Sequence, residues 1–239
     1  MKFRRLLNKS VACLHILEAN ALPSFSQVGE DMIVNFLFKS LEIPNPSYLD
    51  IGVNHPVNGN NTYFFYQRGS RGVCIEPDPI LFGLIKQKRK HDTIINCGIG
   101  LHEQELAPFY IFPGKFSAWN TFSQDEAKIR ENESGITIKE IKVPLRSINQ
   151  IIAENFKSYP NYISIDVEGL DLEILESFDF EKFNTEVFCV ETIEFSTDNK
   201  GSKINEIGEF MKSKGYFVYA DTYVNTIFCR NELFKTVAS

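Results

Sequence analysis

The sequence predicts an α/β fold, a doubly wound sheet that is mostly parallel and has an antiparallel last strand. Three observations predict it. Short apolar runs, typical of strands buried on both faces, alternate with segments of helical periodicity. The run 48–51 contains Asp50 and the run 72–75 is followed by Glu76, and these two acids lie about one βαβ unit apart. The last two runs are joined only by residues 221–225, too few for a parallel crossover, so this pair must be antiparallel.

The elements follow from local signals in chain order. Residues 1–40 are expected to be helical, in one segment that Pro23 ends and a second that begins near Ser26. The expected strands are 48–51, 72–75, 93–96, 162–166, 187–191, 216–220 and 226–229. The other expected helices are 61–68, 79–90, 147–155, 170–178 and 203–214.

Punctuating residues support these boundaries. Gly69 and Gly215 suit the left-handed position that closes a helix, and Pro79 suits a first helical turn. The stretch 102–140 is polar and irregular, with an added strand expected within 136–144. Because a long loop in a compact domain is often a lid or a binding surface, this stretch is a candidate for either. Its aromatic and polar residues would face a sugar ring or anchor the loop by packing: Phe116, Ser117, Trp119 and Asn120.

The N-terminus imitates a secretory signal. Basic residues precede an apolar patch, and Ala19-Asn20-Ala21 has the form of a cleavage site. Polar residues such as Lys9 and Glu18 interrupt the patch, however, and no run approaches the ~20 apolar residues of a membrane span. We therefore expect a cytoplasmic protein without a membrane span.

Composition narrows the function classes. The net charge of −6 argues against a general nucleic-acid binder. The tight basic cluster at 86–90, which includes Arg89, is expected to be the solvated end of a helix. The five cysteines fit no metal or disulfide spacing, and four of them lie in apolar runs, which indicates small buried side chains.

The antiparallel last pair also separates two cofactor classes. A mostly parallel sheet with one reversed strand is the layout of class I methyltransferases, whereas a nicotinamide dehydrogenase would keep its last strand parallel. After Asp50 the sequence reads Ile-Gly-Val-Asn-His-Pro-Val-Asn-Gly-Asn, without the full G-x-G-x-x-G fingerprint. That fingerprint lets a backbone touch a pyrophosphate, which S-adenosylmethionine lacks.

Five short motifs resemble those of the FkbM family of S-adenosylmethionine-dependent methyltransferases. They occur in order over roughly residues 24–195: SQVGED at 26–31, YLDIGVN at 48–54, NTY at 61–63, GVCIEPDP at 72–79 and IDVEG at 165–169. Asp171 stands where the family usually has Glu, and His55-Pro56 replaces a more usual Asp-Gly.

The resemblance implies methyl transfer from S-adenosylmethionine, usually to a hydroxyl oxygen, with sugars of surface polysaccharides or secondary metabolites as frequent acceptors. The acceptor would be a small molecule or a nucleotide sugar. Residues 41–239 would form the methyltransferase domain, with 1–40 as a helical segment packed on it. The alternatives are N-methylation of a small amine and a non-catalytic nucleoside-binding protein.

Strand-end residues supply the cofactor candidates. Glu76 would accept hydrogen bonds from both ribose hydroxyls. Asp50 would hold the methionine end, with capping of a helix as the alternative, and Gly52 would leave room for the cofactor. Gln27 and Asp31 from the N-terminal segment are candidates with helix capping as the alternative, and Asn54 is one with a turn as the alternative. The remaining candidates are Pro77, which follows Glu76, and Asn96 and Cys97, which end the third expected strand.

Asp166 and Glu168 are the expected catalytic residues. They follow the 162–166 strand, and a carboxylate base would assist a weakly acidic sugar hydroxyl. His55 is a possible second base, with a surface turn as the alternative. With Glu191, the two acids would form an oxygen-rich cluster for Mg²⁺ or Mn²⁺, although clustered acids also serve as bases and caps. A metal ion is thus possible, but the sequence favours a reaction without one.

Overall fold

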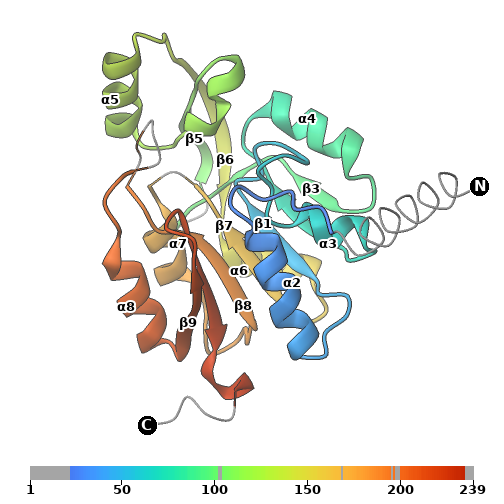
Figure 1. The fold of residues 1–239 in the computed structure, drawn as a ribbon. Helices are drawn as coiled ribbons and strands as arrows, with labels where there is room; N and C mark the ends of the chain where they lie inside the picture. Colours follow the sequence, from blue (N-terminus) through green and yellow to red (C-terminus); the bar gives the residue numbers. More distant parts are fainter. Residues whose placement is uncertain (1–21, 102–103, 168, 195, 197–199, 235–239) are drawn as a thin grey trace, which may run out of the picture.

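The computed structural model describes residues 22–101, 104–167, 169–194, 196 and 200–234. A seven-stranded sheet has the order β3-β2-β1-β7-β8-β10-β9 (Figure 1). Its strands are β1 (Tyr48–Ile51), β2 (Gly72–Ile75), β3 (Thr93–Ile95), β7 (Tyr162–Ile165), β8 (Val187–Glu191), β9 (Tyr216–Asp221) and β10 (Asn225–Arg230).

The strand directions confirm the predicted sheet. β1 pairs in parallel with β2 and β7, β2 with β3, and β7 with β8. β10 is antiparallel to both β8 and β9, and it lies between them rather than at the edge. The observed strands agree with the expected ones to within two residues at each end.

Helices cover both faces of the sheet because successive strand side chains point to opposite faces. Leu49 and Ile51 pack with α6, α7 and α8, while Tyr48 packs with α2, α3 and α4 on the other face. The helices are α2 (Glu30–Ser40), α3 (Tyr63–Gln67), α4 (Pro79–Lys88), α6 (Ile148–Asn155), α7 (Asp171–Ser177) and α8 (Asn205–Ser213). Residues 1–21 of the first expected helical segment lie outside the described residues, whereas α2 is present and contributes Val34 and Leu37 to the core.

A small second sheet interrupts the alternation, where the sequence predicted an irregular stretch. It has the order β4-β6-β5, from β4 (Gly98–Ile99), β5 (Gln104–Ile111) and β6 (Lys139–Arg146). β6 confirms the added strand, but β5, the 3₁₀ helix Gly114–Trp119 and α5 (Gln124–Ser134) were not predicted. Figure 1 shows this unit at one end of the molecule, beside α4.

Four cysteines, Cys74, Cys97, Cys189 and Cys229, are buried free thiols, as expected. None of the helices described is both long enough and apolar enough to cross a membrane.

Candidate active site

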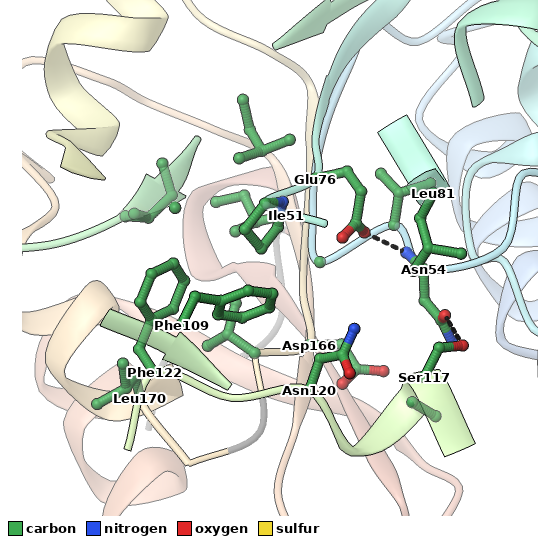
Figure 2. Close-up of a pocket in the computed structure, with 18 of the residues that line it drawn as sticks. Ile51, Asn54, Glu76, Leu81, Phe109, Ser117, Asn120, Phe122, Asp166 and Leu170 are labelled. Atoms are coloured by element: carbon green, nitrogen blue, oxygen red, sulfur yellow. Dashed lines mark hydrogen bonds between the residues drawn. The ribbon is translucent and has the colours of Figure 1, made fainter. Parts of the chain in front are cut away.

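A pocket open to solvent lies where β1, β2, β3 and β7 end (Figure 2). It encloses about 880 Å³ of space between the atoms, part of which is open solvent. Seven of the residues expected from the sequence line it: Gln27, Gly52, Asn54, Glu76, Pro77, Cys97 and Asp166. The carboxyl ends of neighbouring parallel strands meet here, which is where open α/β sheets bind ligands.

Gly52 follows β1 in the left-handed region, with φ +82°. A Cβ atom at this position would lie 1.8 Å from the carbonyl oxygen of Asp166. A side chain therefore cannot be accommodated without moving one of the two loops. The glycine lets the loop after β1 and the loop after β7 pack directly against each other at the pocket wall.

Glu76 is the first residue beyond β2, and only 3% of it is exposed. Its Oε2 accepts a hydrogen bond from the backbone N–H of Asn54 (2.8 Å) and its Oε1 accepts one from that of Asp78 (2.9 Å). Burial raises the pKa of Glu76 to about 8, although both hydrogen bonds act against this rise. The carboxyl group thus lines the pocket in a fixed orientation, with an unusual affinity for a proton (Figure 2).

Asp166 is the first residue beyond β7 and also lines the pocket. Burial raises the pKa of Asp166 to about 6, the charge of Asp50 acts in the same direction, and a hydrogen bond with Glu191 opposes it. Glu191 ends β8, and the register of Ile165 opposite Val190 brings the two acids to neighbouring positions. Glu168 lies outside the described residues.

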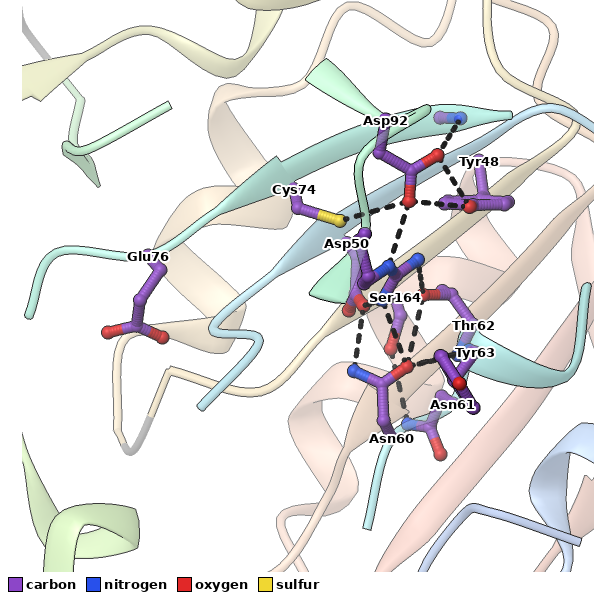
Figure 3. Close-up of polar contacts among 12 residues, drawn as sticks. Tyr48, Asp50, Asn60, Asn61, Thr62, Tyr63, Cys74, Glu76, Asp92 and Ser164 are labelled. Atoms are coloured by element: carbon purple, nitrogen blue, oxygen red, sulfur yellow. Dashed lines mark hydrogen bonds and ion pairs between the residues drawn. The ribbon is translucent and has the colours of Figure 1, made fainter. Parts of the chain in front are cut away.

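Asp50 does not line the pocket; its side chain points from β1 into a buried polar network (Figure 3). Its Oδ2 accepts hydrogen bonds from Thr62 Oγ1 (2.6 Å) and Asn60 Nδ2 (3.1 Å), and Arg89 Nη1 lies 3.4 Å away. Figure 3 shows Glu76 apart from this network. The contacts favour a structural role for Asp50, so its contact with a cofactor stays a prediction.

The expectation that Arg89 is solvated is wrong, because its side chain is fully buried. Its Nε donates to Asp92 Oδ2 (2.8 Å), and Asp92 also accepts from the hydroxyl of Tyr48 (2.8 Å). The lysines around it, Lys86, Lys88 and Lys90, are exposed as expected. Two buried acids provide the partners that an interior guanidinium requires.

Two further predicted residues, Asp31 and Asn96, do not line the pocket. Asp31 accepts hydrogen bonds from the backbone N–H of Phe25 (2.6 Å) and from the hydroxyl of Ser24 (2.7 Å). Asn96 Nδ2 donates to the carbonyl oxygens of Glu76 (2.7 Å) and Pro77 (2.9 Å), which supports the end of β2.

His55 is exposed, and its Nδ1 accepts from the backbone N–H groups of Val57 (3.1 Å) and Asn58 (2.8 Å). These contacts favour the turn alternative. Within the described part of the chain, no three His, Cys, Asp or Glu side chains are grouped to hold a metal ion.

The small sheet closes one side of the pocket. Ser117 and Asn120, which the sequence placed in a possible lid, line it, and so do Phe109 and Phe122, which the sequence did not single out. Trp119 instead packs against Phe112 and Phe116, with ring centroids 5.8 and 4.8 Å apart, so it anchors the segment.

Several solved methyltransferase structures resemble this fold at low identity. The TehB-like SAM-dependent methyltransferase from Corynebacterium glutamicum is 11% identical, with 93% of this chain and 96% of that chain covered and a TM-score of 0.45. The O-methyltransferase from Bacillus cereus in complex with SAH is 14% identical, with 90% and 86% covered and a TM-score of 0.44. Magnesium protoporphyrin IX methyltransferase from Synechocystis PCC 6803 with bound SAH is 10% identical, with 84% and 81% covered and a TM-score of 0.45.

No curated protein matches the sequence. The methyltransferase FkbM domain, by contrast, matches residues 50–218, well over half of the chain, and this range contains the end of β1 and all of β2, β3 and β7. The chain therefore belongs to the FkbM methyltransferase family and is an S-adenosylmethionine-dependent methyltransferase.

Proposed function

We propose that this enzyme methylates a hydroxyl oxygen of a sugar or glycan-like acceptor, in the biosynthesis of a surface polysaccharide or a secondary metabolite. The observation that carries the proposal is a carboxyl group, Asp166, in the pocket wall with its pKa raised to about 6. A carboxylate of raised pKa is a stronger base than an ordinary one, and it is still ionised at neutral pH. A sugar hydroxyl needs such a base more than an amine does.

The pocket fits the cofactor of the family. Glu76 offers a fixed carboxyl group for two neighbouring hydroxyls, and Gly52 keeps the wall beside it free of side-chain atoms. Phe109 and Phe122 give the far side of the pocket an apolar surface suited to a flat ring. The other residues proposed to hold it are Gln27, Asn54, Pro77 and Cys97.

S-adenosylmethionine, when bound, supplies a methyl group on a sulfonium centre. Asp166 would orient the acceptor hydroxyl and take its proton as the oxygen forms its bond to the methyl carbon and the carbon–sulfur bond breaks. The proton then resides on the carboxyl group until solvent removes it.

The test is a panel of nucleotide-activated sugars and amino sugars offered with isotopically labelled S-adenosylmethionine. Carbon–proton correlation spectra of the product would identify the methylated atom, and we expect a methoxy signal. A label found only on nitrogen would replace this proposal with the N-methyltransferase alternative. Binding of S-adenosylhomocysteine without turnover of any acceptor would favour the non-catalytic alternative.

A matched pair of variants tests the base. Asp166→Asn should lower kcat by about 10²–10⁴-fold, the usual contribution of a general base, and should abolish the rise in rate as pH increases through about 6. Asp179→Asn makes the same change at an exposed position and should leave kcat unchanged. Full activity of Asp166→Asn would exclude Asp166 as the base and direct attention to Glu168.

A further inference from the structure

The loop 166–170 connects β7 to α7 and carries Asp166 to the pocket. Its first residue is well fixed: the N–H of Asp166 donates to the carbonyl oxygen of Ile51 (3.1 Å), and its own carbonyl packs against Gly52. After Asp166 the chain leaves the sheet, and Gly169 adopts φ +106°. Whatever holds the described residues beyond Asp166 therefore controls the direction in which the Asp166 side chain emerges.

Asp171 holds the loop residues that follow Asp166. It is the first residue of α7 and only 4% exposed. Its Oδ1 accepts a hydrogen bond from the N–H of Val167, and its Oδ2 accepts one from the N–H of Gly169, both at 3.3 Å. The two oxygens of one carboxylate thus grip the loop at two points.

The contacts of Asp171 extend beyond ordinary helix capping. Leu170, the residue that precedes α7, makes no side-chain cap hydrogen bond. A capping acid normally satisfies the free N–H groups of its own helix. The Asp171 carboxylate interacts with its own backbone N–H, but each of its oxygens also accepts from an N–H group of the preceding loop. Burial raises the pKa of Asp171 to about 7, and the charge of Asp166 adds to the rise. Burial of an acid beside a second acid costs free energy. What the arrangement provides in return is a fixed loop geometry.

We propose that Asp171 is a positioning residue, which holds Val167 and Gly169 in the conformation that presents Asp166 to the acceptor. The proposal rests on the proposed role of Asp166 as the base. It assigns Asp171 no contact with the cofactor or the acceptor, and Asp171 is not among the residues that line the pocket.

The experiment compares Asp171→Asn and Asp171→Glu with Glu173→Gln, which removes an exposed acid from the same helical turn. The first readout is hydrogen exchange at the amides of Val167 and Gly169. The second is the titration of the Asp166 carboxyl carbon by NMR, which requires no acceptor. Thermal melting verifies that each variant is folded.

For Asp171→Asn we expect faster exchange at both amides and a lower pKa of Asp166, because the released loop exposes the Asp166 carboxyl group to solvent and burial is the main cause that raises its pKa. The acids that act on Asp166, namely Asp50 on β1, Glu191 on β8 and Glu30 on α2, remain in place. With an acceptor, kcat should fall about 100-fold, as for a misplaced catalytic group, while KM for S-adenosylmethionine changes less than about threefold. Asp171→Glu should restore part of the kcat, and Glu173→Gln should alter none of these quantities.

Unchanged exchange and an unchanged Asp166 titration in folded Asp171→Asn would overturn the proposal. So would an equal loss of kcat and of S-adenosylhomocysteine affinity, which indicates a general structural role. Failure of the proposed function has a different signature: Asp166→Asn would keep full activity while the exchange and titration results stayed as expected.

Discussion

The hydroxyl of Ser117 donates a hydrogen bond to Oδ1 of Asn54 at 2.9 Å, which joins the 3₁₀ helix Gly114–Trp119 to the loop after β1 (Figure 2). The backbone N–H of Asn54 in turn donates to Glu76. Asn54 holds the left-handed conformation, with φ 50°, which few non-glycine residues adopt. The Ser117 contact therefore stabilises the residue that orients the Glu76 carboxyl group.

Ser117→Ala removes this contact and should weaken S-adenosylhomocysteine binding by about 0.5–1.5 kcal/mol, the net value of one hydrogen bond. Isothermal titration calorimetry measures the loss. Ser158→Ala changes an exposed serine and serves as the control. Equal affinities for the two variants would mean that the wall provided by the small sheet does not support the cofactor loop.

Glu76 should make the stability of the ligand-free protein depend on pH. Its pKa rises from 4.5 to about 8 on folding, so the native state binds more protons than the unfolded state between these values. The free energy of unfolding therefore contains a term that is fully present below pH 4.5 and is lost as pH rises through about 8. Urea denaturation across this range should show a decline in the wild type and a flatter profile in Glu76→Gln.

Binding should show the opposite trend. Ribose hydroxyls donate more strongly to an ionised carboxylate, so S-adenosylhomocysteine affinity should increase as pH rises toward about 8. Glu76→Gln should bind about 1.5–3 kcal/mol more weakly and lose most of this dependence. The exposed Glu206 offers a control, Glu206→Gln. Wild-type affinity in Glu76→Gln would remove Glu76 from the cofactor site.

Gly52→Ala should destabilise the protein by about 3 kcal/mol or more, because it combines a left-handed conformation with a clash against Asp166. Gly69→Ala separates the two effects. Gly69 has φ +100°, but a Cβ there would meet no atom within 4 Å, so only about 1 kcal/mol of strain is expected. Similar denaturation midpoints for the two variants would show that the Asp166 loop moves aside easily.

Arg89→Met should cost about 3–5 kcal/mol of stability, since it leaves Asp50 and Asp92 buried without their cationic partner. Lys88→Met, one residue away and exposed, should change the melting temperature little. Asp50→Asn tests the same network from its other end. A large loss of stability with little loss of S-adenosylhomocysteine affinity is expected, and the reverse pattern would restore Asp50 to the cofactor site.

Central strands were predictable from sequence because they are buried on both faces and read as uninterrupted apolar runs. β5 was not, since Pro108 within it argues against a strand. Proline is tolerated there because β5 is an edge strand of its sheet. Its partner, β6, begins at Lys139, and no local pattern reports a pairing that distant.

The orientations of single side chains, such as those of Glu76 and Asp50, could likewise be predicted only in part. Glu76 was predictable because it follows its strand and so belongs to the sheet end. Asp50 lies inside β1, where it alternates with Leu49 and Ile51 and must face the opposite side. The alternation of side chains along β1 therefore argues against contact between Asp50 and the cofactor. The burial of Arg89 could not be predicted from a local pattern, because its partners come from β1, the residue before α3 and the turn before β3.

The small sheet is one contiguous stretch of coding sequence, which leaves the main fold after β3 and rejoins it at α6. It contributes an entire wall of the pocket, yet the Gly52–Asp166 contact is formed without it. A chimera joined at these two junctions should therefore replace that wall in one step and keep the Gly52–Asp166 packing, which makes the two junctions a direct route to engineering the acceptor specificity.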